Sequence, residues 1–178
     1  MALSSTIYKA DLDISDMDRH YYANHALTLA MHPSENETRL MLRLLAFALH
    51  ANEALSFTRG LCAEDEPDVW QKDLTGDIEL WIEVGQPDER RLRKACGRAR
   101  QVVVYNYSAR AAAIWWDKSA KDFSRLNNLS VFVVDDASVE ALEALAARTM
   151  RLSFTIQDGD VWVSDGAVNV PLVFRKLM

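Results

Sequence analysis

The stretch that decides the fold is Asp77-Ile-Glu-Leu-Trp-Ile-Glu-Val84, followed by Gly85-Gln-Pro-Asp-Glu-Arg-Arg91. Apolar and polar residues alternate over 77–84, which is the period of a β-strand with one buried face. Pro87-Asp-Glu89 then suits the start of a helix, because proline fits its first turn and acids favour its positive end. An apolar stripe at helical spacing continues to about residue 100, and an apolar run at 102–107 is typical of a strand. The sequence therefore predicts two parallel strands of one sheet, joined by a crossover helix.

The segments on either side of this unit extend the same architecture. Ser34 and Glu37 have the spacing of a capping box, and the apolar stripe behind them predicts a helix that runs to about residue 51. The remaining segments also have strand or helix patterns: strands at 6–14, 22–31, 55–58, 129–134, 151–157, 161–164 and 168–174, and helices at about 108–125 and at 137–148. We expect an α/β fold, with one mixed sheet flanked by helices and with β hairpins added at the N- and C-terminal ends.

Length and composition favour one soluble domain. The 178 residues, 49% of them apolar, are enough for a single core, so we expect one domain over 1–178 with its core at about 34–107. No apolar run reaches the roughly 18 to 20 residues that a membrane-spanning helix needs. Cys62 and Cys96 are too far apart for a CxxC pair. These features predict a cytoplasmic protein that does not associate with a membrane.

Several common catalytic motifs are missing from the sequence. It contains no Gly-x-Gly-x-x-Gly, no phosphate-binding loop that ends in Gly-Lys-Ser or Gly-Lys-Thr, no Gly-x-Ser-x-Gly and no His-Glu-x-x-His. The four histidines have no zinc-ligand spacing. Glycine-rich nucleotide binding, serine hydrolase chemistry and histidine-based zinc chemistry are therefore not expected.

Charge is distributed unevenly along the chain. Residues 64–89 hold ten acids and one base, whereas residues 90–100 hold six bases and no acid. Within the predicted helix, Arg90, Lys94 and Arg98 lie in one row. They could face the phosphates of DNA or RNA, or they could pair with the acids before them on an exposed surface. The net charge of -6 argues only against a protein that coats nucleic acid nonspecifically.

The acids suggest a second kind of site. Asp77, Glu79 and Glu83 share one face of the predicted strand, while Asp68 lies in the segment before it and Glu37 lies at a helix start. Carboxylates that converge from several elements suit Mg²⁺, which is typically held by one or two of them together with a substrate phosphate. Alternatively, the strand acids form a solvated face and Glu37 is only the capping partner of Ser34.

Residues along essentially the whole chain resemble the bacterial YaeQ family. The most specific match is Ile78-Glu-Leu-Trp-Ile-Glu-Val-Gly-Gln-Pro-Asp-Glu-Arg-Arg91. Shorter matches occur at 6–10, 32–35, 57–62, 66–68, 114–116 and 155–159. The resemblance implies a variant of the PD-(D/E)xK superfamily, whose restriction-endonuclease-like core runs helix, three strands, helix, strand. A third strand is then expected within 67–74.

The resemblance also implies roles for individual residues. Pro67-Asp68 matches the "PD" element, and Glu83-Val84-Gly85 matches "(D/E)xK" with glycine where the superfamily has lysine. Asp77 competes with Asp68 for the role of first aspartate, since it shares a strand face with Glu83. Glu37 is the candidate for the additional helix acid that the superfamily often uses.

The function implied is metal-dependent phosphodiester cleavage. Asp68 or Asp77 and Glu83 would bind Mg²⁺, and Gln86 or Lys94 would replace the missing lysine in orienting the attacking water. Phosphates would contact the arginines of the basic helix, Arg90, Arg91 and Arg98. Two alternatives stay open: an inactive protein that associates with nucleic acid or regulates, and a protein-interaction module with the same fold.

Overall fold

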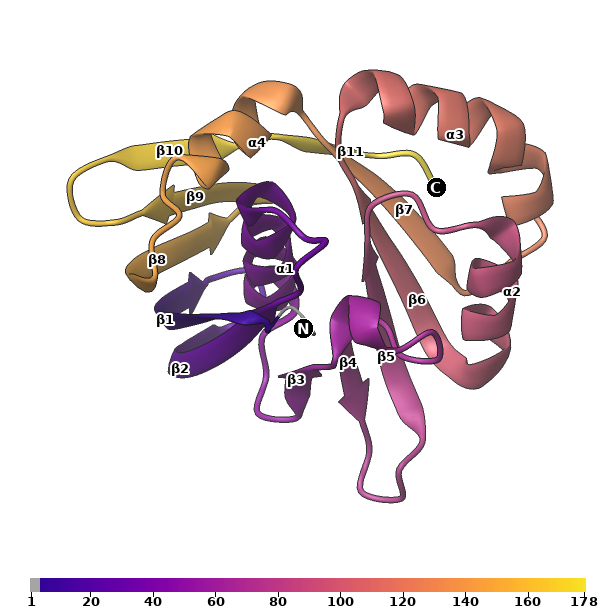
Figure 1. Cartoon of the computed structure of the whole chain (residues 1–178), viewed down its shortest axis with the longest axis horizontal. Helices are drawn as coiled ribbons and strands as arrows, with labels where there is room; N and C mark the ends of the chain where they lie inside the picture. The colour runs from indigo at the N-terminus through magenta and orange to yellow at the C-terminus, as the bar shows by residue number, and fades with distance from the viewer. Residues whose placement is uncertain (1–3) are drawn as a thin grey trace. The chain divides into compact units, whose positions relative to one another are not determined.

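The computed structural model in Figure 1 describes residues 4–178, with the Cys62 side chain excepted. The chain divides into two compact units. The first consists of the chain up to Asn52 together with Ala137–Val173, and the second of Glu53–Asp136 with Phe174–Met178. Each unit contains a mixed β-sheet, so the α/β fold class is confirmed. The single domain expected over 1–178 stays a prediction.

The second unit contains the segment 77–91. Its sheet has the order β11-β7-β6-β5-β4-β3. The strands are β3 (Leu55–Phe57), β4 (Val69–Lys72), β5 (Ile78–Val84), β6 (Ala99–Asn106), β7 (Leu129–Val134) and β11 (Phe174–Lys176). β5 and β6 pair in parallel, as predicted, and β4 is the strand expected within 67–74. β3, β4 and β5 are antiparallel, whereas β6 and β7 are parallel.

Two helices of this unit connect its parallel strands (Figure 1). α2 (Glu89–Arg98) lies between β5 and β6 in the chain, and α3 (Ala109–Phe123) lies between β6 and β7. Both helices contribute to one apolar core: Leu92 and Ala95 of α2 and Phe123 of α3 cluster with Trp81 of β5 and with valines of β6. A short 3-10 helix, η1 (Gly60–Cys62), precedes β4.

The first unit has its own five-stranded sheet, of order β10-β9-β8-β1-β2. The strands are β1 (Thr6–Asp16), β2 (Tyr21–Met31), β8 (Thr149–Gln157), β9 (Asp160–Ser164) and β10 (Asn169–Leu172). Both predicted hairpins form, but the prediction of one mixed sheet is wrong, because β1 pairs in parallel with β8 and the hairpins make a second sheet. Local periodicity contains no information on a pairing between segments about 140 residues apart.

The helices of the first unit are α1 (Glu37–His50) and α4 (Asp136–Glu143). The predicted capping box is wrong: Asn36 is the N-cap, and its side chain accepts from the N–H of Arg39. Asn36 directly precedes the helix, whereas Ser34 lies two residues too early. The helix predicted at 137–148 ends at Glu143, where a turn leads into β8. Among the described residues, no helix is long and apolar enough to cross a membrane.

Candidate functional site

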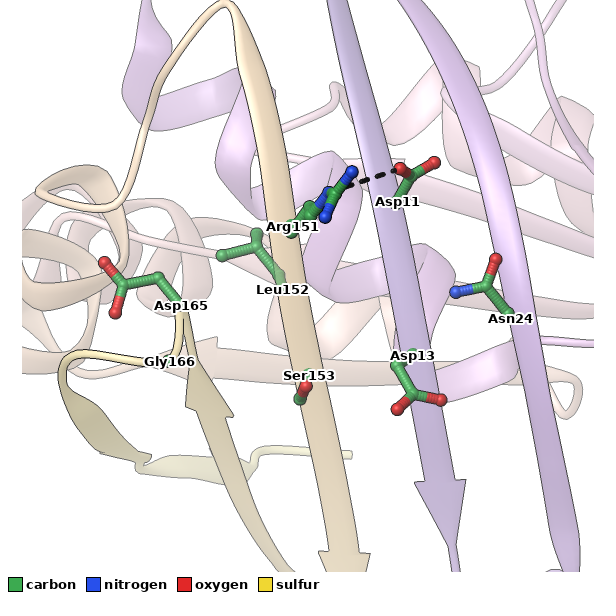
Figure 2. Close-up of a pocket in the computed structure, with 8 residues that line it drawn as sticks. All are labelled: Asp11, Asp13, Asn24, Arg151, Leu152, Ser153, Asp165 and Gly166. Atoms are coloured by element: carbon green, nitrogen blue, oxygen red, sulfur yellow. Dashed lines mark ion pairs between the residues drawn. The ribbon is translucent and has the colours of Figure 1, made fainter.

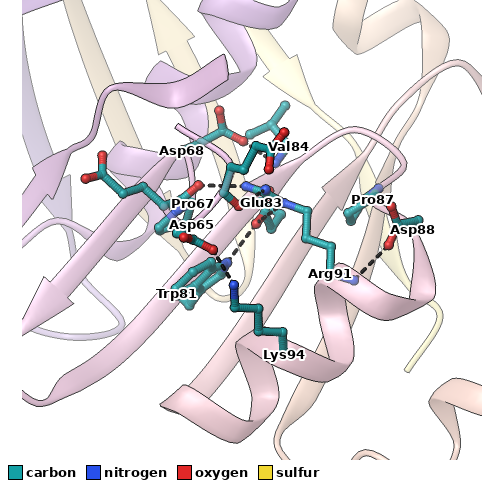
Figure 3. A network of polar contacts seen from close by, with 12 residues as sticks. Asp65, Pro67, Asp68, Trp81, Glu83, Val84, Pro87, Asp88, Arg91 and Lys94 are labelled. Atoms are coloured by element: carbon teal, nitrogen blue, oxygen red, sulfur yellow. Dashed lines mark hydrogen bonds and ion pairs between the residues drawn. The ribbon is translucent and has the colours of Figure 1, made fainter. Parts of the chain in front are cut away.

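Two buried carboxylates meet at the end of the β4–β5 pair. Asp68 immediately precedes β4, and its backbone N–H donates to the carbonyl of Ile82 at 3.0 Å. Its side-chain Oδ2 accepts from the N–H of Val84 at 2.8 Å. The two bonds join Asp68 to the residues directly before and after Glu83. The carboxylates of Asp68 and Glu83 are therefore neighbours (Figure 3). Both residues are buried, with 2% and 3% of their surface exposed.

Glu83 is held by two donors. Its Oε1 accepts from the indole Nε1 of Trp81 at 2.7 Å and from Nε of Arg91 at 2.8 Å. The Arg91 guanidinium also donates to the carbonyls of Glu64 and Glu66, at 2.7 and 2.6 Å. Arg91 therefore connects α2, the carboxylate pair and the segment before β4, as Figure 3 shows.

The environment of Glu83 alters its acidity. Burial and, after it, the negative charge of Asp68 raise the pKa of the Glu83 carboxyl from the ordinary 4.5 to about 7. The Arg91 guanidinium and the Trp81 indole lower the pKa but do not cancel the effect. The raised pKa of Glu83 shows that this buried place, with two carboxyl groups and one guanidinium, favours an added positive charge, whether a proton or a cation.

The bases of α2 mostly contact the acidic segment 64–66. Lys94 forms an ion pair with Asp65, and Arg98 donates to the Asp65 carbonyl at 3.0 Å. Arg98 also lies over the ring of Trp81, with 5.4 Å between its Cζ and the ring centroid. Arg90 is exposed and has no hydrogen bond or ion pair within the part of the chain that the structure describes. Of the row Arg90, Lys94 and Arg98, only Lys94 thus pairs with a preceding acid side chain among the described residues.

A pocket of about 460 Å³ opens between this segment and the start of α2. Its lining residues are Glu64, Asp65, Asp88, Arg90, Arg91 and Lys94. Asp88 caps the helix by accepting from the N–H of Arg91 at 2.7 Å, which fixes the first turn. Arg90, Arg91 and Lys94 bring positive charge to the pocket, and Arg91 links it to Glu83.

A second pocket, of about 410 Å³, lies in the first unit and is shown in Figure 2. Its lining residues are Asp11, Asp13, Asn24, Arg151, Leu152, Ser153, Asp165 and Gly166. Arg151 forms an ion pair with Asp11 at 4.0 Å, and both side chains are exposed. None of the predicted site residues lines this pocket, so the candidate site belongs to the second unit.

The position of the missing lysine has an unusual backbone. Gly85 has a φ of +108°, which a residue with a side chain rarely adopts. A Cβ built there would lie 3.8 Å from Cε1 of Tyr107, so backbone conformation rather than crowding is the obstacle. The chain path at Gly85 therefore suits glycine and disfavours lysine.

Gln86, a candidate to replace that lysine, is engaged elsewhere. Its Nε2 donates to Oδ1 of Asn106 at 2.6 Å and to the carbonyl of Tyr107 at 2.7 Å. Since a carbonyl accepts from the same nitrogen, Asn106 must present its oxygen to Gln86. The Nδ2 of Asn106 is then buried without a hydrogen-bond partner among residues 4–178.

Asn106 lies on the same side of the sheet as Glu83. Val104 pairs in parallel register with Glu83, and Asn106 is two residues further along β6, about 7 Å on. A buried amide donor is costly to leave unpaired, by about 1 to 3 kcal/mol, so the Asn106 donor is available to a water or a ligand. Asn106 was not among the residues predicted from the sequence, because a lone asparagine at a strand end has no distinguishing pattern.

The other predicted ligands lie elsewhere. Asp77 is exposed before the start of β5, where its N–H donates to Asp73, six residues or about 20 Å along the strand from Glu83. Glu37 belongs to the first unit and accepts from the hydroxyl of Tyr8 at 2.7 Å. Within the described residues, no three His, Cys, Asp or Glu side chains form a cluster that would hold a metal ion. Of the four predicted ligands, the structure brings together Asp68 and Glu83.

Comparisons with known proteins give one consistent result. A family model described as "YaeQ protein" matches residues 1–173. An "Uncharacterized protein YaeQ" of Escherichia coli (strain K12) is 49% identical over 170 residues, which cover 96% of this chain and 94% of that protein. A protein of the same description from Salmonella typhi is also 49% identical, covering 97% and 95%.

Solved structures agree with the sequence comparisons. The crystal structure of a YaeQ protein from Xanthomonas axonopodis pv. citri is 51% identical, with a TM-score of 0.94 over 98% of this chain and 99% of that one. A YaeQ protein from Pseudomonas syringae is 35% identical, with a TM-score of 0.93 over 98% and 96%. Both proteins are similar to this chain in sequence and in fold over nearly its whole length.

Proposed function

We propose that this chain, which belongs to the YaeQ family, is a magnesium-dependent phosphodiesterase that acts on DNA or RNA. The observation that carries the proposal is the buried pair of Asp68 and Glu83, held next to each other by adjacent antiparallel strands. Burying two like charges side by side is costly unless a cation accompanies them. Arg91 supplies one positive charge to the pair, and a metal ion would compensate the second carboxylate.

The order of elements around the pair supports the same proposal. A restriction-endonuclease-like core requires a helix, three strands, a helix and a strand. Along the sequence, α1 of the first unit is followed by β3, β4, β5, α2 and β6 of the second unit. Asp68 lies at the start of the second of the three strands, and Glu83 lies near the end of the third. These are the positions that the "PD" and "(D/E)xK" elements would occupy.

The donor set fits magnesium. Asp68 and Glu83 provide hard carboxylate oxygens, and one or two carboxylates suffice for an ion that keeps several waters and a substrate phosphate. Both residues would hold the ion, which when bound supplies an activated water and stabilises negative charge on the transferred phosphoryl group. A third carboxylate ligand is therefore not required for magnesium binding.

Other residues near the carboxylate pair would stabilise charge and bind the substrate phosphates. Arg91 brings to Glu83 the positive charge that a lysine at position 85 would bring, and it can stabilise charge but cannot act as a base because a guanidinium stays protonated. Asn106 has a buried amide donor on the same side of the sheet, suited to a phosphate oxygen. Arg90 and Lys94 line the pocket through which phosphates would approach.

Three observations favour a second candidate, an inactive protein that has kept the fold. Gly85 is built for a positive φ, and Lys94 and Gln86 contact Asp65 and Asn106 rather than Glu83. On this alternative the carboxylate pair stays bound to Arg91, and the basic helix associates with nucleic acid or with an acidic protein partner.

Metal binding separates these candidates. Crystals soaked in Mn²⁺, which gives an anomalous signal, should contain an ion bound by Asp68 and Glu83, and Asp68→Asn should remove it. Asp77→Asn is the matched control, since it changes an exposed aspartate outside the pair and should leave the ion in place. Crystals that show no ion at the pair, or an ion at Asp77, would exclude the proposed site.

The basic helix provides a separate prediction. Replacing Arg90, Lys94 and Arg98 together by glutamine should weaken nucleic-acid binding and lower the slope of log K against log salt by nearly one unit for each phosphate that the variant no longer neutralises. Binding titrations at two salt concentrations measure both quantities. Arg93→Gln is the control, because Arg93 pairs with Glu89 and lies outside that row.

Two results would count against a phosphate-facing helix. Equal affinities and equal salt slopes for wild type and triple variant would show that the row does not contact nucleic acid. A fall in affinity accompanied by unfolding would indicate that the bases act through segment 64–66, so thermal unfolding must be followed in parallel.

A further inference from the structure

Among residues 4–178, the four edge strands of the two sheets differ in how they are protected. β3 and β11 have three residues each, and β11 contains Arg175 and Lys176. β10 has four residues and contains Pro171. Shortness, charge and proline are the usual means by which a sheet edge avoids pairing with another chain. The fourth edge, β2, has none of them.

β2 is an edge strand of eleven residues, Tyr21–Met31. Its sequence, Tyr-Tyr-Ala-Asn-His-Ala-Leu-Thr-Leu-Ala-Met, contains no Asp, Glu, Lys, Arg, Pro or Gly. It pairs with β1 in an unbroken antiparallel register from Tyr21 to Met31, without a bulge that would turn the edge away. The strand is thus a long and regular template for one more strand.

Within the described residues, little contacts this edge. No strand pairs with the outer side of β2. Arg43 donates to the carbonyl of Ala30 at 3.3 Å near one end, and Arg19 lies over the ring of Tyr21 at the other. Between these ends Asn24, Ala26 and Thr28 are exposed, and Tyr22 has 62% of its surface exposed.

We propose that the outer edge of β2 pairs with β2 of a second copy of the chain, antiparallel and about a two-fold axis, so that two five-stranded sheets become one of ten strands. An antiparallel pair of identical strands is self-complementary, as a closed dimer requires. If the axis passes near Ala26, its small side chain meets its own copy, and Asn24 faces Thr28 of the second copy. Both pairings are sterically and chemically compatible on one face of a sheet.

Charge favours a second copy as the occupant. Because β2 is uncharged, no like charges face one another across the new pair. The nearest acids on the exposed face, Asp11 and Asp13, lie on β1, one strand in from the edge. Three strand spacings would then separate the two β1 strands, about 14 Å. That distance exceeds the Debye length of about 8 Å at physiological salt, so their repulsion is screened.

The oligomeric state of the full chain tests this proposal. Sedimentation over a hundredfold range of concentration should show wild type reaching a mass twice the 20.2 kDa of one chain. Ala26→Lys with Thr28→Lys should raise the dimer dissociation constant at least tenfold, because it places four ammonium groups along the shared edge. Both positions are exposed, so the fold should tolerate the change.

Ser153→Lys is the matched control. It adds the same kind of charge to the exposed face of the same sheet, but on β8, which is flanked by β1 and β9 and has no free edge. It should leave the dimer intact. Hydrogen exchange of wild type gives a second measurement that needs no variant: the amides of β2 should become more protected as concentration rises.

Either of two outcomes would overturn the proposal. A wild type that stays monomeric throughout, with β2 exchange independent of concentration, would leave the edge to a different partner. A dimer that Ser153→Lys weakens as much as the double variant does would mean that the sheet face, not its edge, forms the contact.

Discussion

Purified Glu83→Gln should lose magnesium-dependent phosphodiester cleavage by at least about a hundredfold relative to wild type, the scale on which removing one preorganised group at a catalytic site acts. Glutamine keeps the shape of the side chain but removes the charge that would hold the ion. It can still accept from Trp81 and Arg91, so the buried contacts of Glu83 need not collapse. Cleavage of labelled DNA and RNA, with and without Mg²⁺, measures the effect.

Glu79→Gln is the control for this experiment. Glu79 lies on the same face of β5, but it is half-buried and pairs with Gln71 and Arg100 away from Asp68. Its substitution should leave cleavage near the wild-type rate. If Glu83→Gln cleaves as fast as wild type, the mechanism proposed for the carboxylate pair is wrong.

The second large effect concerns stability and pH in the absence of metal. The pKa of Glu83 is raised from 4.5 to about 7, so between these values the folded chain binds more protons at this site than the unfolded chain does. The contribution of Glu83 to stability is therefore fully present below about pH 4.5 and is lost as the pH rises through 7. A shift of about 2.5 units corresponds to about 3 kcal/mol.

Glu83→Gln removes this dependence. We expect its free energy of unfolding, relative to wild type, to improve by about 3 kcal/mol from pH 4.5 to pH 8, as measured by urea denaturation with a chelator present. Burial is the largest contribution to the effect, and the charges of Asp68 and Arg91 and the hydrogen bond from Trp81 modify it. A constant difference across this range would mean that Glu83 is not strained by its burial.

The difference between the two proteins must be used, because His50 acts in the opposite direction. Burial, followed by the charge of Arg19, lowers the pKa of His50 from 6.5 to about 4. Its contribution to stability is present above pH 6.5 and is lost as the pH falls through 4. Since His50 is the same in both chains, subtraction cancels its contribution and leaves that of Glu83.

The features that could be predicted from sequence are those that depend on local periodicity. The alternation at 77–84 and the helix and strand after it specify β5, α2 and β6, and the length of the connection predicts their parallel pairing. The positions of Asp68 and Glu83 followed from the resemblance to a known family. Neither the prediction of the strand–helix–strand unit nor that of the two acids required knowledge of contacts between residues distant in sequence.

The features that could not be predicted depend on such contacts. The second sheet requires β1 to pair with β8, and no turn or repeat relates these strands in the sequence. Arg91 is predicted to contact phosphates, which stays a prediction; the sequence did not indicate that its side chain reaches back eight residues to Glu83 and to two carbonyls before β4. Helical spacing indicates which side of α2 a residue occupies, not which partner a long side chain reaches.

The backbone at Gly85 limits how the chain can change in evolution or in the laboratory. A side chain at a φ of +108° costs about 1 to 3 kcal/mol of strain, so Gly85→Lys would not simply supply the amine that the "(D/E)xK" pattern has at this position. Improved variants, natural or selected, should therefore acquire their ammonium group at neighbouring positions and retain Gly85.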